Sequence, residues 1–136
     1  MKNAALVFSG RFEMSRQQAA IQQIDMAIEL FHRRQWPCSI TLALAVETQL
    51  QSSAKPFVMS KLQSEFGAEF VDTLNEPRNR LKHTKDRDTV TIFEMDALMA
   101  VLRAISKFTA SYGAWSEDMA KFDASFKERL AEVPDV

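Results

Sequence analysis

The sequence predicts an all-α protein, an antiparallel bundle of four long helices with one or two short ones. Apolar residues recur at steps of three and four over helix-length segments, which is the period of one helix face. Glycine and proline, of which the chain has 3 and 4, separate these segments at helix-sized intervals. Strand-like alternation of useful length is confined to residues 89–93.

The first predicted helix spans residues 15–35. Ser15 with Gln18 three residues later is typical of a capping box at a helix start. The residues that share its apolar face are Ile21, Ile24, Ile28 and Phe31. We therefore expect residues 1–14 to form an N-terminal arm and residues 15–136 a single helical-bundle domain.

A second helix is expected around Pro37, because proline in a first turn gives up only an N–H that lacks an intrahelical partner. Its residues 40–46 are apolar nearly all round, which predicts a central position in the bundle. A short helix over residues 56–66 follows, and another runs from residue 68 into a basic segment.

The last two predicted helices also have amphipathic patterns. Thr91 and Glu94 indicate a second capping box. The helix that it opens has on one side Leu98, Val101, Leu102, Ile105 and Phe108. A final helix after Ser116 presents Met119, Phe122, Phe126 and Leu130.

Composition and charge restrict the class of protein. The chain is 46% hydrophobic and 26% charged, as in an ordinary globular domain. A net charge of −1, from 17 basic and 18 acidic residues, excludes a generally basic nucleic-acid coat and leaves room for a local patch. The single Cys38 cannot form an internal disulfide, and the apolar run at residues 4–8 is shorter than a signal-peptide core or a membrane span. We expect a cytoplasmic protein outside the membrane, with Cys38 as a small packing residue.

Metal and phosphate-loop chemistry find no support in the residue pattern. The chain has no phosphate-binding glycine loop or paired-cysteine motif, and His32 and His83 are far apart in sequence. We therefore expect neither a metal site nor a cofactor. His32, near a helix C-terminus, is expected to complement the helix dipole.

Residues 78–87 concentrate five of the seventeen basic side chains together with a histidine. A solvated helix face is one interpretation of this run. Helical spacing, however, places Arg78 on the apolar stripe between Leu74 and Leu81. Glu47 lies in an apolar stripe in the same way. Because a charge on a buried face is costly unless it is paired, Arg78 and Glu47 are natural partners for each other or for a second subunit.

Asn79 and His83 are four residues apart and share a helix face, so the amide can orient the imidazole. At this point the sequence resembles the HEPN (higher eukaryotes and prokaryotes nucleotide-binding) domain family. The resemblance rests on Arg78-Asn79-x-x-x-His83, which is similar to the family's Arg-x(4–6)-His motif at a helix end. It extends over residues 15–112, with Leu44-Ala45-Val46-Glu47 in an Ala-rich helix upstream and an amphipathic helix downstream. Pro77, directly before the arginine, departs from the pattern.

The resemblance implies a homodimer whose two motifs face each other across the interface and cut RNA without a metal ion. Arg78 would stabilise charge on the pentacoordinate phosphate, and His83 would act as general acid or base. Asn79 would position His83 or the phosphate. Contacts to the RNA backbone would come from Arg80, Lys82, Lys85 and Arg87.

The same resemblance leaves two functions open. One is an RNase of a toxin–antitoxin or defence system, in which a nucleotidyltransferase-like antitoxin is the partner. The alternative is a noncatalytic HEPN-type module that mediates helical interactions or binds nucleotides. An unrelated helical adaptor is a third interpretation, and it is disfavoured because the Met and Phe residues lie in core phase.

Overall fold

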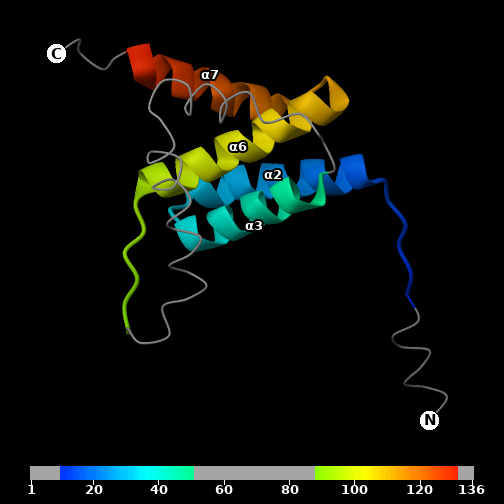
Figure 1. The fold of residues 1–136 in the computed structure, drawn as a ribbon, viewed down its shortest axis with the longest axis horizontal. Helices are drawn as coiled ribbons and strands as arrows, with labels where there is room; N and C mark the ends of the chain where they lie inside the picture. Colours follow the sequence, from blue (N-terminus) through cyan, green and yellow to red (C-terminus); the bar gives the residue numbers. More distant parts are fainter. Residues whose placement is uncertain (1–9, 51–87, 132–136) are drawn as a thin grey trace.

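The computed structural model describes residues 10–50 and 88–131, which form four α-helices and no strand (Figure 1). The helices are α2 (Arg16–His32), α3 (Trp36–Gln49), α6 (Glu94–Tyr112) and α7 (Glu117–Ala131). The predicted all-helical fold class is confirmed for these residues. The helices predicted over residues 56–66 and from residue 68 onward lie outside the described part of the chain.

The four helices lie alongside one another, with α2 and α7 running in one direction and α3 and α6 in the other (Figure 1). Helices that follow each other directly, α2 with α3 and α6 with α7, are therefore antiparallel, whereas α3 and α6 are parallel. This arrangement differs from a bundle that is antiparallel throughout. As a result, α3 ends and α6 begins at opposite ends of the bundle (Figure 1).

The second helix, α3, which the sequence predicts to be central, has the two most extensive helix–helix interfaces, with α6 and with α2. α2 packs against α3, α6 and α7, whereas the extensive contacts of α3 are with α2 and α6. The apolar side chains Leu42 and Leu44 of α3 are only partly buried.

The start of α2 is the predicted capping box. The Ser15 hydroxyl accepts a hydrogen bond from the Gln18 backbone N–H at 3.0 Å, and the Gln18 side-chain oxygen accepts one from the Ser15 N–H at 3.3 Å. Two of the N–H groups that lack an intrahelical partner are satisfied in this way. The face that α2 buries consists of Ala20, Ile24, Ala27, Ile28 and Phe31.

A tight turn joins α2 to α3. The Gln35 N–H donates to the Leu30 carbonyl at 2.9 Å, and the Arg34 N–H donates to the Phe31 carbonyl at 3.0 Å. These two bonds are those of a Schellman motif, in which the residue after the C-cap has a left-handed conformation. That residue is Arg34, with φ of 61°. An arginine therefore occupies a left-handed position at which glycine is favoured.

The first turn of α3 contains Pro37, as predicted. Cys38 is exposed, so its predicted role as a packing residue was wrong. The small buried residue is its neighbour Ser39, whose hydroxyl donates to the Ala27 carbonyl at 2.8 Å. Small side chains on both helices, including Ala43, let α2 and α3 approach closely, and the hydrogen bond satisfies the one buried polar side chain found there.

The helix α6 begins two residues later than predicted. Its N-cap is Phe93, not Thr91, because the Asp96 carboxylate accepts a hydrogen bond from the Phe93 N–H at 2.8 Å. Residues 89–93 form neither helix nor strand. The helix ends at Tyr112, and its C-cap Gly113 has φ of 66°. All of the predicted core-face residues of α6 are buried, namely Leu98, Val101, Leu102, Ile105 and Phe108.

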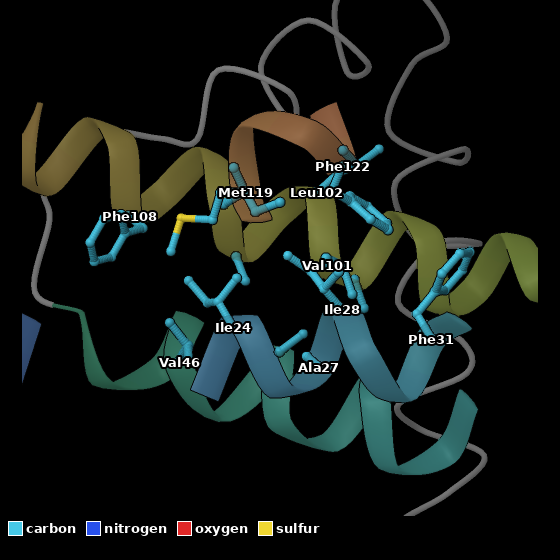
Figure 2. Packing of buried hydrophobic residues seen from close by; sticks show 14 of the residues in the cluster. Ile24, Ala27, Ile28, Phe31, Val46, Val101, Leu102, Phe108, Met119 and Phe122 are labelled. Carbon is cyan, nitrogen blue, oxygen red and sulfur yellow. The ribbon is translucent and has the colours of Figure 1, made fainter. Parts of the chain in front are cut away.

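The hydrophobic core lies between the helices and receives side chains from all four (Figure 2). Met119 and Phe122 of α7 are buried, as predicted, and Phe126 packs at the edge of the cluster. The Phe31 and Phe122 rings meet edge to face, with centroids 5.3 Å apart and planes at 87°. This geometry is favourable for aromatic pairs and fixes α7 against the C-terminal half of α2.

The two left-handed residues that follow helices, Arg34 and Gly113, provide a paired test of the turn geometry. Replacing Arg34 with glycine should raise the free energy of unfolding by about 0.5–1 kcal/mol, because relief of the left-handed strain exceeds the added chain entropy. Replacing Gly113 with alanine should lower it by about 1 kcal/mol. Nothing lies within 4 Å of a Cβ built at Gly113, so this cost is one of backbone conformation. Urea denaturation measures both, and stabilisation by both changes would contradict the assigned geometry.

Candidate functional site

The basic motif lies outside the described residues. This applies to every member that the sequence analysis singled out: Arg78, Asn79, Arg80, Lys82, His83, Lys85 and Arg87. In the sequence the motif stands between α3 and α6. The structure does place Glu47, the remaining candidate, near the end of α3, together with the residues around it.

Glu47 forms an ion pair across the interface between α3 and α6. Its carboxylate oxygen Oε1 accepts a hydrogen bond from the Arg103 guanidinium at 2.8 Å. The two side chains are only 18% and 12% exposed. The partner that the structure gives Glu47 is thus Arg103, which sequence reasoning missed, while Arg78 lies outside the described residues. A pair this far from water contributes more than an exposed one and is costly to break.

Two further cations neutralise the carbonyl end of α3. The Lys107 ammonium donates to the Glu47 backbone carbonyl, and the Arg16 guanidinium donates to the Gln49 carbonyl at 3.4 Å. The last turn of α3 carries no basic residue of its own. Its C-terminal partial negative charge is therefore balanced by side chains from α6 and α2.

The second carboxylate oxygen of Glu47, Oε2, is buried and has no hydrogen-bond partner among the described residues. A buried acceptor without a partner costs about 1–3 kcal/mol. The end of α3 therefore combines three nearby cations with a carboxylate that has the capacity to accept one more donor. Arg103 and Lys107 lie four residues apart on α6, and no Asp or Glu stands three or four positions from either of them. Two cations without an acid at helical spacing indicate an acidic residue on another helix, and this pattern could have been found in the sequence.

A second polar site joins α2 to the start of α7. The Ser116 hydroxyl accepts a hydrogen bond from the Met119 N–H at 3.2 Å, as an N-cap does, and donates to the Asp25 carboxylate at 2.8 Å. Asp25 follows the fully buried Ile24 in the sequence. The residues Asp25 and Ser116 thus fix where α7 begins along α2.

Burial raises the pKa of Asp25 above its ordinary value. The hydrogen bond from Ser116 acts in the opposite direction and lowers this pKa, while the negative charge of Asp118 raises it further. The net shift means that these surroundings stabilise the carboxylate less well, relative to the protonated form, than water does.

Asp25 and Asp118 lie in an open groove of about 1160 Å³ along α2 and α7. Its α2 side includes Asp25, Ile28 and His32, and its α7 side includes Asp118 and Phe122. The exposed His32 ring stands edge-on to Phe122, with centroids 6.1 Å apart. The groove therefore has an aromatic floor and charged rims.

Within residues 10–50 and 88–131 no group of three or more His, Cys, Asp or Glu side chains is arranged to hold a metal ion. None of the helices in the same ranges is both long enough and apolar enough to cross a bilayer.

Comparisons of the whole chain with protein-family models, with curated proteins and with solved structures find no match.

The raised pKa of Asp25 leads to a prediction with a defined sign. Because its pKa in the folded state lies above that in the unfolded state, the neutral form favours folding, and this contribution is lost as the pH rises above about 4. Asp25→Asn should remove that part of the pH dependence, as measured by urea denaturation at several pH values.

Two neighbouring changes test the assigned causes. In NMR titrations of the Asp25 carboxyl carbon, Ser116→Ala should raise the pKa further, because the hydrogen bond to the carboxylate is lost. Asp118→Asn should lower it, because a negative charge is removed. A shift of either variant in the opposite direction would show that the assigned cause is wrong.

Proposed function

We propose that this chain is a HEPN-like protein that acts as a homodimeric, metal-independent endoribonuclease. The observation that carries the proposal is the Arg78-Asn79-x-x-x-His83 motif in a chain whose described part is all-helical. The motif follows a helix that bears Leu44-Ala45-Val46-Glu47 and precedes an amphipathic helix, α6, in the order that the resemblance implies.

The proposed chemistry is transesterification at an RNA phosphate. His83 acts as general base toward the 2′-hydroxyl or as general acid toward the leaving 5′-oxygen, and in a dimer the two copies supply both roles. Arg78 stabilises the additional negative charge on the pentacoordinate phosphate. Asn79 orients the imidazole. The phosphates on either side are held by Arg80, Lys82, Lys85 and Arg87, a role that needs positive charge more than exact geometry.

The site around Glu47 supports a role for α3 in holding the motif. Glu47 is fixed by Arg103, and its second carboxylate oxygen is buried with no donor among residues 10–50 and 88–131. An inward Arg78 would supply that donor. In this proposal the acidic residue at the end of α3 orients the arginine, and the arginine binds phosphate with its remaining donors.

The proposed setting is a cytoplasmic toxin–antitoxin or defence system, with a nucleotidyltransferase-like antitoxin as partner. The second candidate function is a noncatalytic helical interaction module. The observation that favours it is the open groove along α2 and α7, because grooves between helices are common sites for a partner helix.

RNA cleavage in the presence of EDTA tests the leading proposal. The purified chain should cut single-stranded RNA and leave 2′,3′-cyclic phosphate ends, and His83→Ala should lower the rate by about 10²–10⁴-fold, because the proton-transfer group is removed. Lys85→Ala should only weaken binding, with a smaller dependence on salt concentration.

The chain provides a matched control, because it has only two histidines. His32→Ala should cleave as fast as the wild type, since His32 lies exposed at the end of α2. Equal cleavage by wild type and His83→Ala would reveal a contaminating nuclease. Absence of cleavage with every RNA tested would favour the interaction module.

A further inference from the structure

The start of α6 carries a group of apolar side chains that face solvent. Of the six large apolar residues that are exposed in the described part of the chain, three lie within residues 90–95, namely Val90, Phe93 and Met95. Phe93 is 59% exposed and is the only aromatic residue of the three. Exposed apolar groups that gather in one place mark interaction sites, whereas single ones scattered over a surface are ordinary. The start of α6 is therefore a candidate binding surface.

The Phe93 ring contributes neither to the helix cap nor to the core. Phe93 is the N-cap of α6 and makes no side-chain hydrogen bond there. The residues favoured at this position have a side-chain oxygen that accepts a bond from a free N–H of the first turn, and a phenyl ring has none. The apolar contact with the core at this point comes from the preceding residue, Ile92, which is partly buried. A serine would thus suit the helix better than the phenylalanine does.

Arg34 lies at the same end of the bundle, because α2 ends and α3 begins where α6 begins (Figure 1). Arg34 is exposed and, unlike its neighbour Arg33, forms no ion pair within residues 10–50 and 88–131. Its φ of 61° is a conformation that costs free energy in every residue other than glycine. Residues held in such conformations cluster at functional sites. Both Arg34 and Phe93 therefore occupy positions where another residue would stabilise the fold more.

An exposed ring and an unpaired cation match the two parts of a single-stranded nucleic acid. Unpaired bases stack on aromatic side chains, and backbone phosphates bind cations. Proteins that bind single strands combine both kinds of contact on one surface. In the sequence Phe93 stands only six positions after Arg87, the last residue of the basic segment.

We propose that Phe93 stacks on an unpaired base of a single-stranded RNA and that Arg34 binds a phosphate of the same strand. This inference rests on the RNA substrate of the proposed function and not on cleavage. It adds a reason for single strands to be preferred, because a base inside a duplex is already stacked between its neighbours and is not accessible to the ring. Both residues bind the strand at a distance from the bond that is cut, so they are binding residues and not catalytic ones.

Two fluorescent probes that cannot be cleaved separate the base contact from the phosphate contact. One is a 2′-O-methyl oligouridine of about twelve nucleotides, and the other is an abasic tetrahydrofuran–phosphate chain of the same length. In anisotropy titrations Phe93→Ser should raise the dissociation constant of the oligouridine about tenfold and leave that of the abasic chain unchanged. Phe93→Trp should bind the oligouridine as tightly as the wild type, whereas Phe93→Leu should be as weak as Phe93→Ser.

The same titrations test Arg34. Arg34→Gly should raise the dissociation constants of both probes by a similar factor, because both carry the phosphate that Arg34 binds. The slope of the logarithm of affinity against the logarithm of salt concentration should become shallower by about 0.7, as for the loss of one phosphate contact on a single strand.

Stability measurements and two matched variants control for damage to the fold. Neither Phe93→Ser nor Arg34→Gly should lower the urea midpoint, because each replaces a residue that its backbone position disfavours. Weaker binding by a protein that is at least as stable is then an effect on the surface. The same substitutions in the N-terminal arm at the opposite end of the bundle, Phe12→Ser and Arg11→Gly, should leave both dissociation constants unchanged.

Three results would overturn the inference. Equal binding of the oligouridine by wild type and Phe93→Ser, a loss of equal size on the abasic chain, or full binding by Phe93→Leu would each rule out stacking. Unchanged binding by Arg34→Gly would rule out the phosphate contact, and a wild type that binds neither probe would rule out both. The cleavage assay decides the proposed function separately: RNA cleavage with unchanged binding in these variants keeps the nuclease and removes this surface, and binding without cleavage does the reverse.

Discussion

A half-buried carboxylate on α3 imposes the strictest condition on how this bundle packs. Glu47 lies in an apolar stripe, and a charge in that position must find a partner or lose the solvation that water provided. Arg103 of α6 is that partner, and Lys107 adds a bond to the Glu47 backbone carbonyl. Both bonds require α3 and α6 to be neighbours, with Glu47 level with the turn of α6 that carries Arg103 and Lys107. The packing of α2 on these two helices, and of α7 on α2, then completes the described core.

Sequence patterns predicted the local features because the interacting residues are close in the chain. The Ser15–Gln18 capping box, Pro37 in a first turn and the core face of α6 are examples. Sequence patterns failed where the apolar residues of a helix did not mark a single face, or where two capping patterns overlapped. α3 is apolar nearly all round, so the pattern did not show that Ser39 faces inward and Cys38 outward. At the start of α6, the Asp96 carboxylate accepts a hydrogen bond from the Phe93 N–H. The helix therefore begins after Phe93 and not after Thr91, as the Thr91–Glu94 pattern predicted.

The candidate sites show the same limit. The Glu47–Arg103 pair joins residues 56 positions apart, and Asp25 and Ser116 are 91 apart. Such contacts depend on which helices become neighbours, and helical periodicity does not determine this. The sequence did indicate that Glu47 was unusual, because it interrupts an apolar stripe. The motif residues from Arg78 to Arg87 lie outside the described part of the chain, so their role rests on the sequence and on the proposal.

A double-mutant cycle measures how strongly the Glu47–Arg103 pair holds α3 against α6. Glu47→Gln, Arg103→Met and the double variant would be compared with wild type by urea denaturation. We expect a coupling energy of about 2 kcal/mol, as for a charged hydrogen bond largely removed from water. The absolute stability of the double variant does not decide the matter, since apolar replacement of a buried pair is often tolerated. A coupling energy below about 0.5 kcal/mol, typical of an exposed pair, would show that this pair does not hold the two helices together.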